Sequence, residues 1–162
     1  MKSRGKLFLI AISCLVALIL LGFGFSPYID AYRINRNLNI SGVKLLMTYP
    51  EVEEHLGKGG PIGGFGAEFY EYDNSAVSIA YPLDGLLRGK AGWIEIKDPR
   101  YSIYGVRIGD SIDKAKIILE KNGFTQDQTD KNFFKRGSAM VYILGESVRV
   151  NIEDWTLKGR VY

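Results

Sequence analysis

Apolar and polar positions along the chain follow two periods, one typical of helices and one typical of strands. Residues 48–51, Thr-Tyr-Pro-Glu, match a capping box with proline in the first turn, and an apolar stripe at helical spacing follows before Gly57. Ser111 begins a second capped segment, which Asn122 and Gly123 end. After each predicted helix come segments with the period-two alternation of strands. The expected strands are 68–72, 76–81, 92–97, 133–135, 139–144 and 147–153, with 156–162 as a further short candidate.

The two helix-and-strand segments resemble each other at a fixed spacing. Residues 40–57 and 103–120 share four identities at an offset of 63. The same offset aligns the first strands that follow, and 89–98 then aligns with 145–154 at an offset of 56. This change of offset places seven extra residues, 82–88, in the first copy. Three aligned blocks in the same order indicate an internal duplication.

The chain begins with a basic flank and an uncharged apolar run over residues 7–25. As a helix this run would span roughly 28 Å, about the thickness of one bilayer core. We expect an uncleaved transmembrane anchor; a cleaved signal peptide and a lipoprotein signal ending at Cys14 are the alternatives. Lys2, Arg4 and Lys6 favour a cytoplasmic N-terminus. The expected location is therefore the cell membrane, with a single-pass signal anchor and an extracytoplasmic, extracellular-type C-terminal domain.

These patterns predict an α+β protein in which an N-terminal transmembrane helix precedes two tandem repeats, each a helix with an antiparallel sheet. A length of 162 residues fits one ordinary domain or two very small ones. The expected boundaries are 1–25 for the basic flank and anchor, 26–39 for a polar and aromatic connector, 40–99 for the first repeat and 100–162 for the second.

Charge and cysteine content exclude several classes of function. The chain has 21 Lys and Arg residues, three of them before residue 7, and the remaining 18 match the 18 Asp and Glu residues. Outside its N-terminal flank the chain is neutral, so its charge gives no support to nucleic-acid binding. Cys14 is the only cysteine, which excludes an intrachain disulfide and a zinc site built from several cysteines.

The sequence at the start of the first predicted helix resembles that of a known family. Residues 47–57, with the pattern Met-Thr-x-x-Glu-Val-x-x-x-Leu-Gly, resemble the helix entry of the beta-lactamase-inhibitor-protein-like fold, which also occurs in outer-membrane-assembly lipoproteins of the SmpA/OmlA type. Family members usually read Gly-Met-Thr there, whereas this chain has Leu46 before the Met and Gly-Asp-Ser at 109–111 in the second copy. The resemblance covers about residues 40–162. It implies a helix packed on an antiparallel sheet, in tandem, with protein-binding or structural roles rather than catalysis, and it carries over no inhibitory residue.

Candidate catalytic and metal-binding residues are sparse. The Gly-rich run 59–66 follows a helix and has no Lys-Ser or Lys-Thr after it, so it predicts a helix-to-strand connection rather than a phosphate loop. His55 is the only histidine and lies beside Glu51 and Glu54. Without a second histidine or a marked nucleophile, an exposed helix residue is the simpler interpretation. We therefore predict no catalytic residue, no metal site and no cofactor.

The seven-residue insertion is the best candidate for a recognition feature. Its two adjacent leucines either enter the core or face a partner. We expect a non-catalytic module that binds a protein or envelope component or has a structural role, and that contacts the lipid bilayer through residues 7–25. The alternative is a small-ligand-binding or hydrolytic domain with its site between the two repeats. The candidate binding residues are Leu83, Asp84, Leu86, Leu87 and Arg88.

Overall fold

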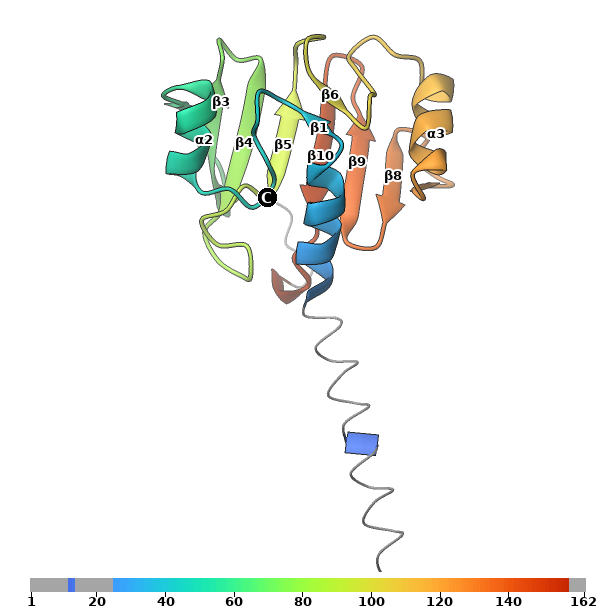
Figure 1. Ribbon diagram of the computed structural model, residues 1–162, viewed down its shortest axis with the longest axis horizontal. Helices are drawn as coiled ribbons and strands as arrows, with labels where there is room; N and C mark the ends of the chain where they lie inside the picture. Colours follow the sequence, from blue (N-terminus) through green and yellow to red (C-terminus); the bar gives the residue numbers. More distant parts are fainter. Residues whose placement is uncertain (1–11, 14–24, 158–162) are drawn as a thin grey trace, which may run out of the picture.

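The computed structural model describes residues 12–13 and 25–157 of the chain. Helical residues 25–35, α2 (Tyr49–Leu56) and α3 (Ile112–Lys121) pack on one face of an eight-stranded sheet (Figure 1). A separate two-stranded ribbon pairs β1 (Leu38–Asn39) with β6 (Ser102–Ile103). The chain is therefore an α+β protein.

Every neighbouring pair of strands in the large sheet is antiparallel. The strand order is β2-β3-β4-β5-β10-β9-β8-β7. The six strands expected from the alternation of apolar residues are confirmed, each to within one residue at either end. The expected last strand is wrong at residues 156–157, which belong to a 3-10 turn, η1 (Trp155–Leu157), and its remainder lies outside the described residues. The strands are β2 (Gly60–Pro61), β3 (Ala67–Tyr72), β4 (Val77–Pro82), β5 (Trp93–Ile96), β7 (Thr125–Gln126), β8 (Phe133–Arg136), β9 (Ala139–Ile143) and β10 (Val148–Ile152).

The strand order is nearly symmetric about the centre of the sheet, where β5 pairs with β10. Ile94 lies opposite Val150 there, and these residues are separated by 56 positions, the second offset between the two copies. Gly42 and Gly105, which are 63 positions apart, share a left-handed backbone with φ of 87° and 83°. This agreement supports a duplication, although the boundaries between the repeats stay a prediction.

Both predicted helices begin at the expected caps. Glu51 accepts hydrogen bonds from the backbone N–H and the hydroxyl of Thr48, at 2.7 and 2.8 Å. These two bonds hold the pKa of the Glu51 carboxyl below its usual range, because they favour its charged form. At the second helix, Ser111 Oγ accepts a hydrogen bond from the Lys114 N–H at 3.2 Å. The caps fix where the apolar stripe of each helix meets the sheet.

The segment expected to be a connector contains a helix that packs on the sheet. Residues 25–35 are helical, and Ala31 and Ile34 are fully buried. Asp30 is buried as well, and its Oδ2 accepts hydrogen bonds from the backbone N–H and the hydroxyl of Ser138, both at 2.9 Å. The buried positions recur at helical spacing, but the polar and aromatic residues between them obscure that pattern in the sequence.

The predicted transmembrane helix requires correction. Most of the expected anchor, residues 7–11 and 14–24, lies outside the described residues. None of the helices in the described part of the chain combines the length and the apolarity needed to cross a bilayer. The described helix at 25–35 carries charged side chains and packs on the sheet instead. The predicted anchor is therefore contradicted, together with the single-pass membrane location that was derived from it.

A cluster of tyrosines fills the space between α2 and the first long strands. The rings of Tyr49 and Tyr70 lie 4.5 Å apart between centroids, and the hydroxyls of Tyr72 and Tyr81 lie 3.1 Å apart. Burial raises the pKa of Tyr72 to about 12 and raises that of Tyr81 as well. The hydrogen bond that Tyr49 donates to Glu53 is the main reason that its own pKa is raised to about 12.

We expect the fold to lose stability as the pH rises from about 10 to about 12. A phenol in the unfolded chain ionises near pH 10, whereas the raised pKa values of Tyr72 and Tyr81 keep these groups protonated in the folded state. The unfolded state then binds fewer protons and is favoured as the pH rises. Phenolate absorbance and circular dichroism should show the last tyrosines ionising together with unfolding. Ionisation of all ten tyrosines in one step, with the fold intact, would contradict the buried cluster.

Candidate functional site

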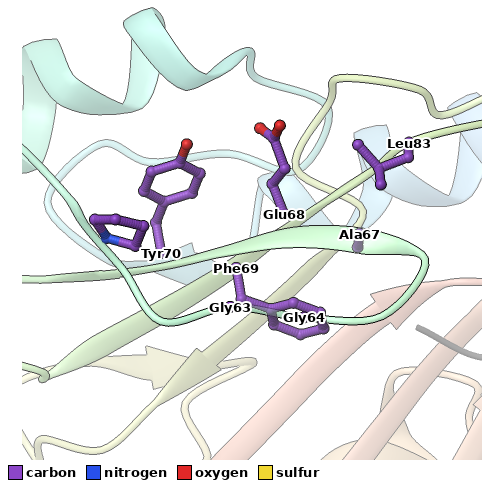
Figure 2. Close-up of a pocket in the computed structure, with 8 residues that line it drawn as sticks. Gly63, Gly64, Ala67, Glu68, Phe69, Tyr70 and Leu83 are labelled. Atoms are coloured by element: carbon purple, nitrogen blue, oxygen red, sulfur yellow. The ribbon is translucent and has the colours of Figure 1, made fainter.

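A hollow of about 350 Å³ lies at the edge of the sheet where β2 meets β3 (Figure 2). Strand β3 runs through it, and the glycine-rich segment after β2 and the start of the loop after β4 complete it. Glu68 and Tyr70 point to one side of β3 and Phe69 to the other, so the hollow includes both sides of the strand. The remaining lining residues are Pro61, Gly63, Gly64, Ala67 and Leu83.

The glycine-rich segment is held against β3 rather than free. The Ile62 N–H donates to the Phe69 carbonyl at 3.0 Å, and the Leu83 N–H donates to the Gly66 carbonyl at 3.1 Å. A Cβ on Gly64 would lie 2.2 Å from the Phe69 ring, so only glycine permits this close approach. The segment therefore forms a fixed wall of the hollow.

We expect Gly64→Ala to destabilise the fold and deform the hollow. The added methyl group overlaps the Phe69 ring, and overpacking of this kind costs about 1–3 kcal/mol. Gly60→Ala is the matched control, because its nearest neighbour would be the Glu71 carbonyl oxygen at 4.0 Å. Urea denaturation should give a lower midpoint for Gly64→Ala than for Gly60→Ala, and equal midpoints would rule out the close contact.

Three large apolar side chains are exposed on the two segments that contribute lining residues to this hollow. Phe65 is 92% exposed, Ile62 53% and Leu83 52%, and together they form what we term the apolar edge surface. Glu68 contributes the one carboxylate to the lining of the hollow. Exposed apolar side chains gathered near a charged group are typical of an interaction site.

The predicted binding loop contributes one residue to the apolar edge surface. Leu83 lines the hollow, as a binding role would require. Leu87 instead is fully buried, and its N–H donates to Asp154 Oδ2 at 3.1 Å, which fixes the loop to the end of β10. The other three candidates do not line the hollow: Asp84 and Leu86 are half-buried and Arg88 is exposed.

The sequence analysis missed Ile62 and Phe65. The sequence around Phe65 offers one local signal. Phe65 lies between Gly64 and Gly66, in a run without the alternation of apolar and polar residues that marks a half-buried strand. The glycine content of that run predicts only a connection between a helix and a strand. An aromatic residue flanked by glycines is therefore a local signal for an exposed side chain.

The sheet face away from the helices is shielded by its own side chains. Phe69 packs edge-on against Trp93, with ring centroids 5.5 Å apart, and the Arg149 guanidinium lies 4.7 Å from the Trp93 ring centroid. Arg149 also donates to Glu95 Oε2 at 3.0 and 3.2 Å. Trp93 is consequently only 7% exposed. The aromatic centre of this face is thus already covered, and the β3 edge is the better candidate for contact with a partner.

The single histidine lies away from the hollow. His55 is on α2, and its imidazole is so close to Gly42 that a Cβ there would lie 2.8 Å from Nδ1. Within the described part of the chain, no three His, Cys, Asp or Glu side chains converge as metal ligands. What the hollow offers a ligand is apolar contact, backbone groups and the Glu68 carboxylate.

Comparison with known proteins finds a solved structure of similar fold but no family for this chain. No family model matches the chain, and no curated relative matches it. A solved structure with a similar fold is an extracellular protein containing an SCP domain from Bacillus anthracis str. Ames, with a TM-score of 0.51 and 11% identity. The match covers 73% of this chain and 47% of that chain, so it extends over about half of the neighbour's length. At this identity the similarity is one of fold alone.

Proposed function

We propose that this chain is a non-catalytic protein-binding module that recognises its partner through the apolar edge surface. The observation that carries the proposal is Phe65, whose side chain is 92% exposed on a segment hydrogen-bonded to β3. Burying such a side chain contributes about 1.5–3 kcal/mol. Because the segment is held in place before binding, little further ordering is needed.

The chemistry of the surface specifies the chemistry of the partner. The hollow beside Phe65 suits an apolar side chain, and the Glu68 carboxylate on its lining suits a cation. The partner is therefore a protein segment that places an apolar residue in the hollow and a lysine or arginine next to Glu68. Aromatic anchors in a pocket with complementary charges are typical of such interfaces.

Two comparisons are consistent with this proposal. The resemblance of residues 47–57 to the beta-lactamase-inhibitor-protein-like fold implies protein-binding or structural roles rather than catalysis. The solved structure of similar fold is a longer protein, described as extracellular and as containing an SCP domain.

A peptide-display selection tests the proposal. A random peptide library is selected on the full chain and then tested on Phe65→Ser, Glu68→Gln and Ile117→Ser variants. Ile117 is the matched control, because it is also a large apolar side chain, 70% exposed, but lies on α3. Enriched peptides should combine an apolar with a basic residue and should lose binding to Phe65→Ser but keep it to Ile117→Ser. Peptides without that composition, or with equal binding to all variants, would contradict the proposal.

A further inference from the structure

A second hollow, of about 270 Å³, lies where the end of helix 25–35 approaches the end of α3 and strand β8. Three guanidinium groups line it, from Arg33, Arg36 and Arg136, and its lining includes no carboxylate. Asn37, Tyr104 and Asn122 complete the lining. None of these residues belongs to the hollow at the β3 edge.

Arg136 is held in a fixed position within this hollow. Its Nη1 donates to the Asn122 carbonyl at 2.7 Å, and its Nη2 donates to the Tyr104 hydroxyl at 2.9 Å. The guanidinium also lies 4.6 Å from the Phe124 ring centroid. Its Nε is buried and has no hydrogen-bond partner among the described residues. The group is therefore oriented before any ligand arrives, which lowers the cost of binding.

The positive charge around this hollow is only partly compensated. Asp30 Oδ1 lies 3.7 Å from Arg33 Nη1, but Asp30 Oδ2 is already engaged by Ser138. Arg36 is exposed, and within the described residues it forms no ion pair. Three guanidinium groups with one nearby carboxylate leave an excess of positive charge.

Stabilisation of helix ends explains part of this arrangement. Cations are favourable near the C-terminal end of a helix, where carbonyl groups lack partners. The bond from Arg136 to the Asn122 carbonyl, just after α3, serves that purpose. It does not account for the buried Nε of Arg136 or for Arg36, which lines the same hollow.

We propose that this hollow binds the oxyanion group of a small molecule, a phosphate or a carboxylate. Guanidinium groups pair with both through two parallel hydrogen bonds. A hollow of about 270 Å³ lies just below the usual range for drug-sized ligands, so it suits a compact anion. This site is independent of the apolar edge surface and of the proposed protein-binding function.

Calorimetric titration of the full chain with inorganic phosphate and with succinate, at constant ionic strength, tests this proposal. We expect saturable binding of at least one anion, accompanied by a shift of the Arg136 Nε–H resonance. Arg36→Gln should weaken that binding at least about tenfold, the loss expected for one hydrogen bond to a charged group. Lys58→Gln removes the same charge from an exposed position after α2 and should leave the affinity unchanged.

The outcomes distinguish a specific anion-binding site from nonspecific attraction of anions to positive charge. Saturable binding that is sensitive to Arg36→Gln supports the proposal, and the more tightly bound anion identifies phosphate or carboxylate as the preferred group. A response that does not saturate, or equal weakening by Arg36→Gln and Lys58→Gln, contradicts it. Phe65→Ser should not alter anion binding, so failure of the protein-binding proposal would leave this result unchanged.

Discussion

Replacing Ile34 with alanine should destabilise the entire fold by roughly 2–5 kcal/mol. Ile34 is fully buried on helix 25–35 and belongs to the same core cluster as Ile94 and Val150, which pair at the centre of the sheet. The shorter side chain leaves a cavity in that core, and the helix cannot close it without moving. Chemical denaturation should show a single transition with a lowered midpoint, because one core serves both halves of the sheet.

Tyr32→Ala is the control for this substitution. Tyr32 lies on the same helix but is 66% exposed, so truncating its side chain should change the free energy of unfolding by only about 0.5 kcal/mol or less. A loss as small for Ile34→Ala as for Tyr32→Ala would show that the helix is not part of the core.

Replacing Asp154 with alanine should cost about 1–3 kcal/mol and should release the loop that carries Leu83. Asp154 is buried, its Oδ2 accepts from the Leu87 N–H at 3.1 Å, and its Oδ1 accepts from the Thr156 N–H at 2.9 Å. Without the carboxylate the buried Leu87 N–H has lost its acceptor, and such groups are expensive to leave unpaired. Thermal denaturation should show the loss, and limited proteolysis should cut the loop near Leu83 more rapidly.

Asp127→Ala provides the comparison. Asp127 Oδ1 also accepts bonds from nearby backbone groups, those of Thr129 and Asp130, but these bonds are exposed to water. Water can replace the lost acceptor there, so the loss of stability should be clearly smaller than for Asp154→Ala. Equal losses for the two variants would mean that Asp154 does not fix the loop.

The elements that depend on local signals could be predicted from the sequence. Thr48 and Ser111 cap their helices as expected. Asp98 and Asp154, which the alignment made equivalent ends of strands, each accept a hydrogen bond from the backbone N–H two residues later. Such caps and turns involve residues close together in the chain, so their patterns survive in one sequence.

Features that depend on distant contacts could not be predicted in the same way. The pairing of β5 with β10 joins segments more than 50 residues apart and merges the two halves into one sheet. The helix at 25–35 has few buried apolar residues and owes its position to the sheet beneath it. Leu46 has a φ of 69°, and Gly109, its equivalent in the second copy, has 81°. A leucine gives no hint of such a conformation in the sequence.

The candidate site was predicted only in part, for the same reason. An insertion with several leucines indicated a possible contact loop, and Leu83 does line the hollow. Leu87, four residues later, is fully buried because Asp154 and the core hold it. Periodicity does not distinguish a buried from an exposed leucine within an irregular loop. The exposure of Phe65 depends on the position of its segment against β3, which its neighbours in the sequence do not indicate.

The affinity of a selected peptide for three versions of the chain tests the central claim most directly, namely that Phe65 anchors a protein partner. The unsubstituted chain and Ile117→Ser should bind the peptide with Kd values that agree to within about twofold. Phe65→Ser should weaken binding by about 10- to 100-fold, which corresponds to the loss of one buried aromatic side chain. Equal Kd values for all three proteins would contradict the claim.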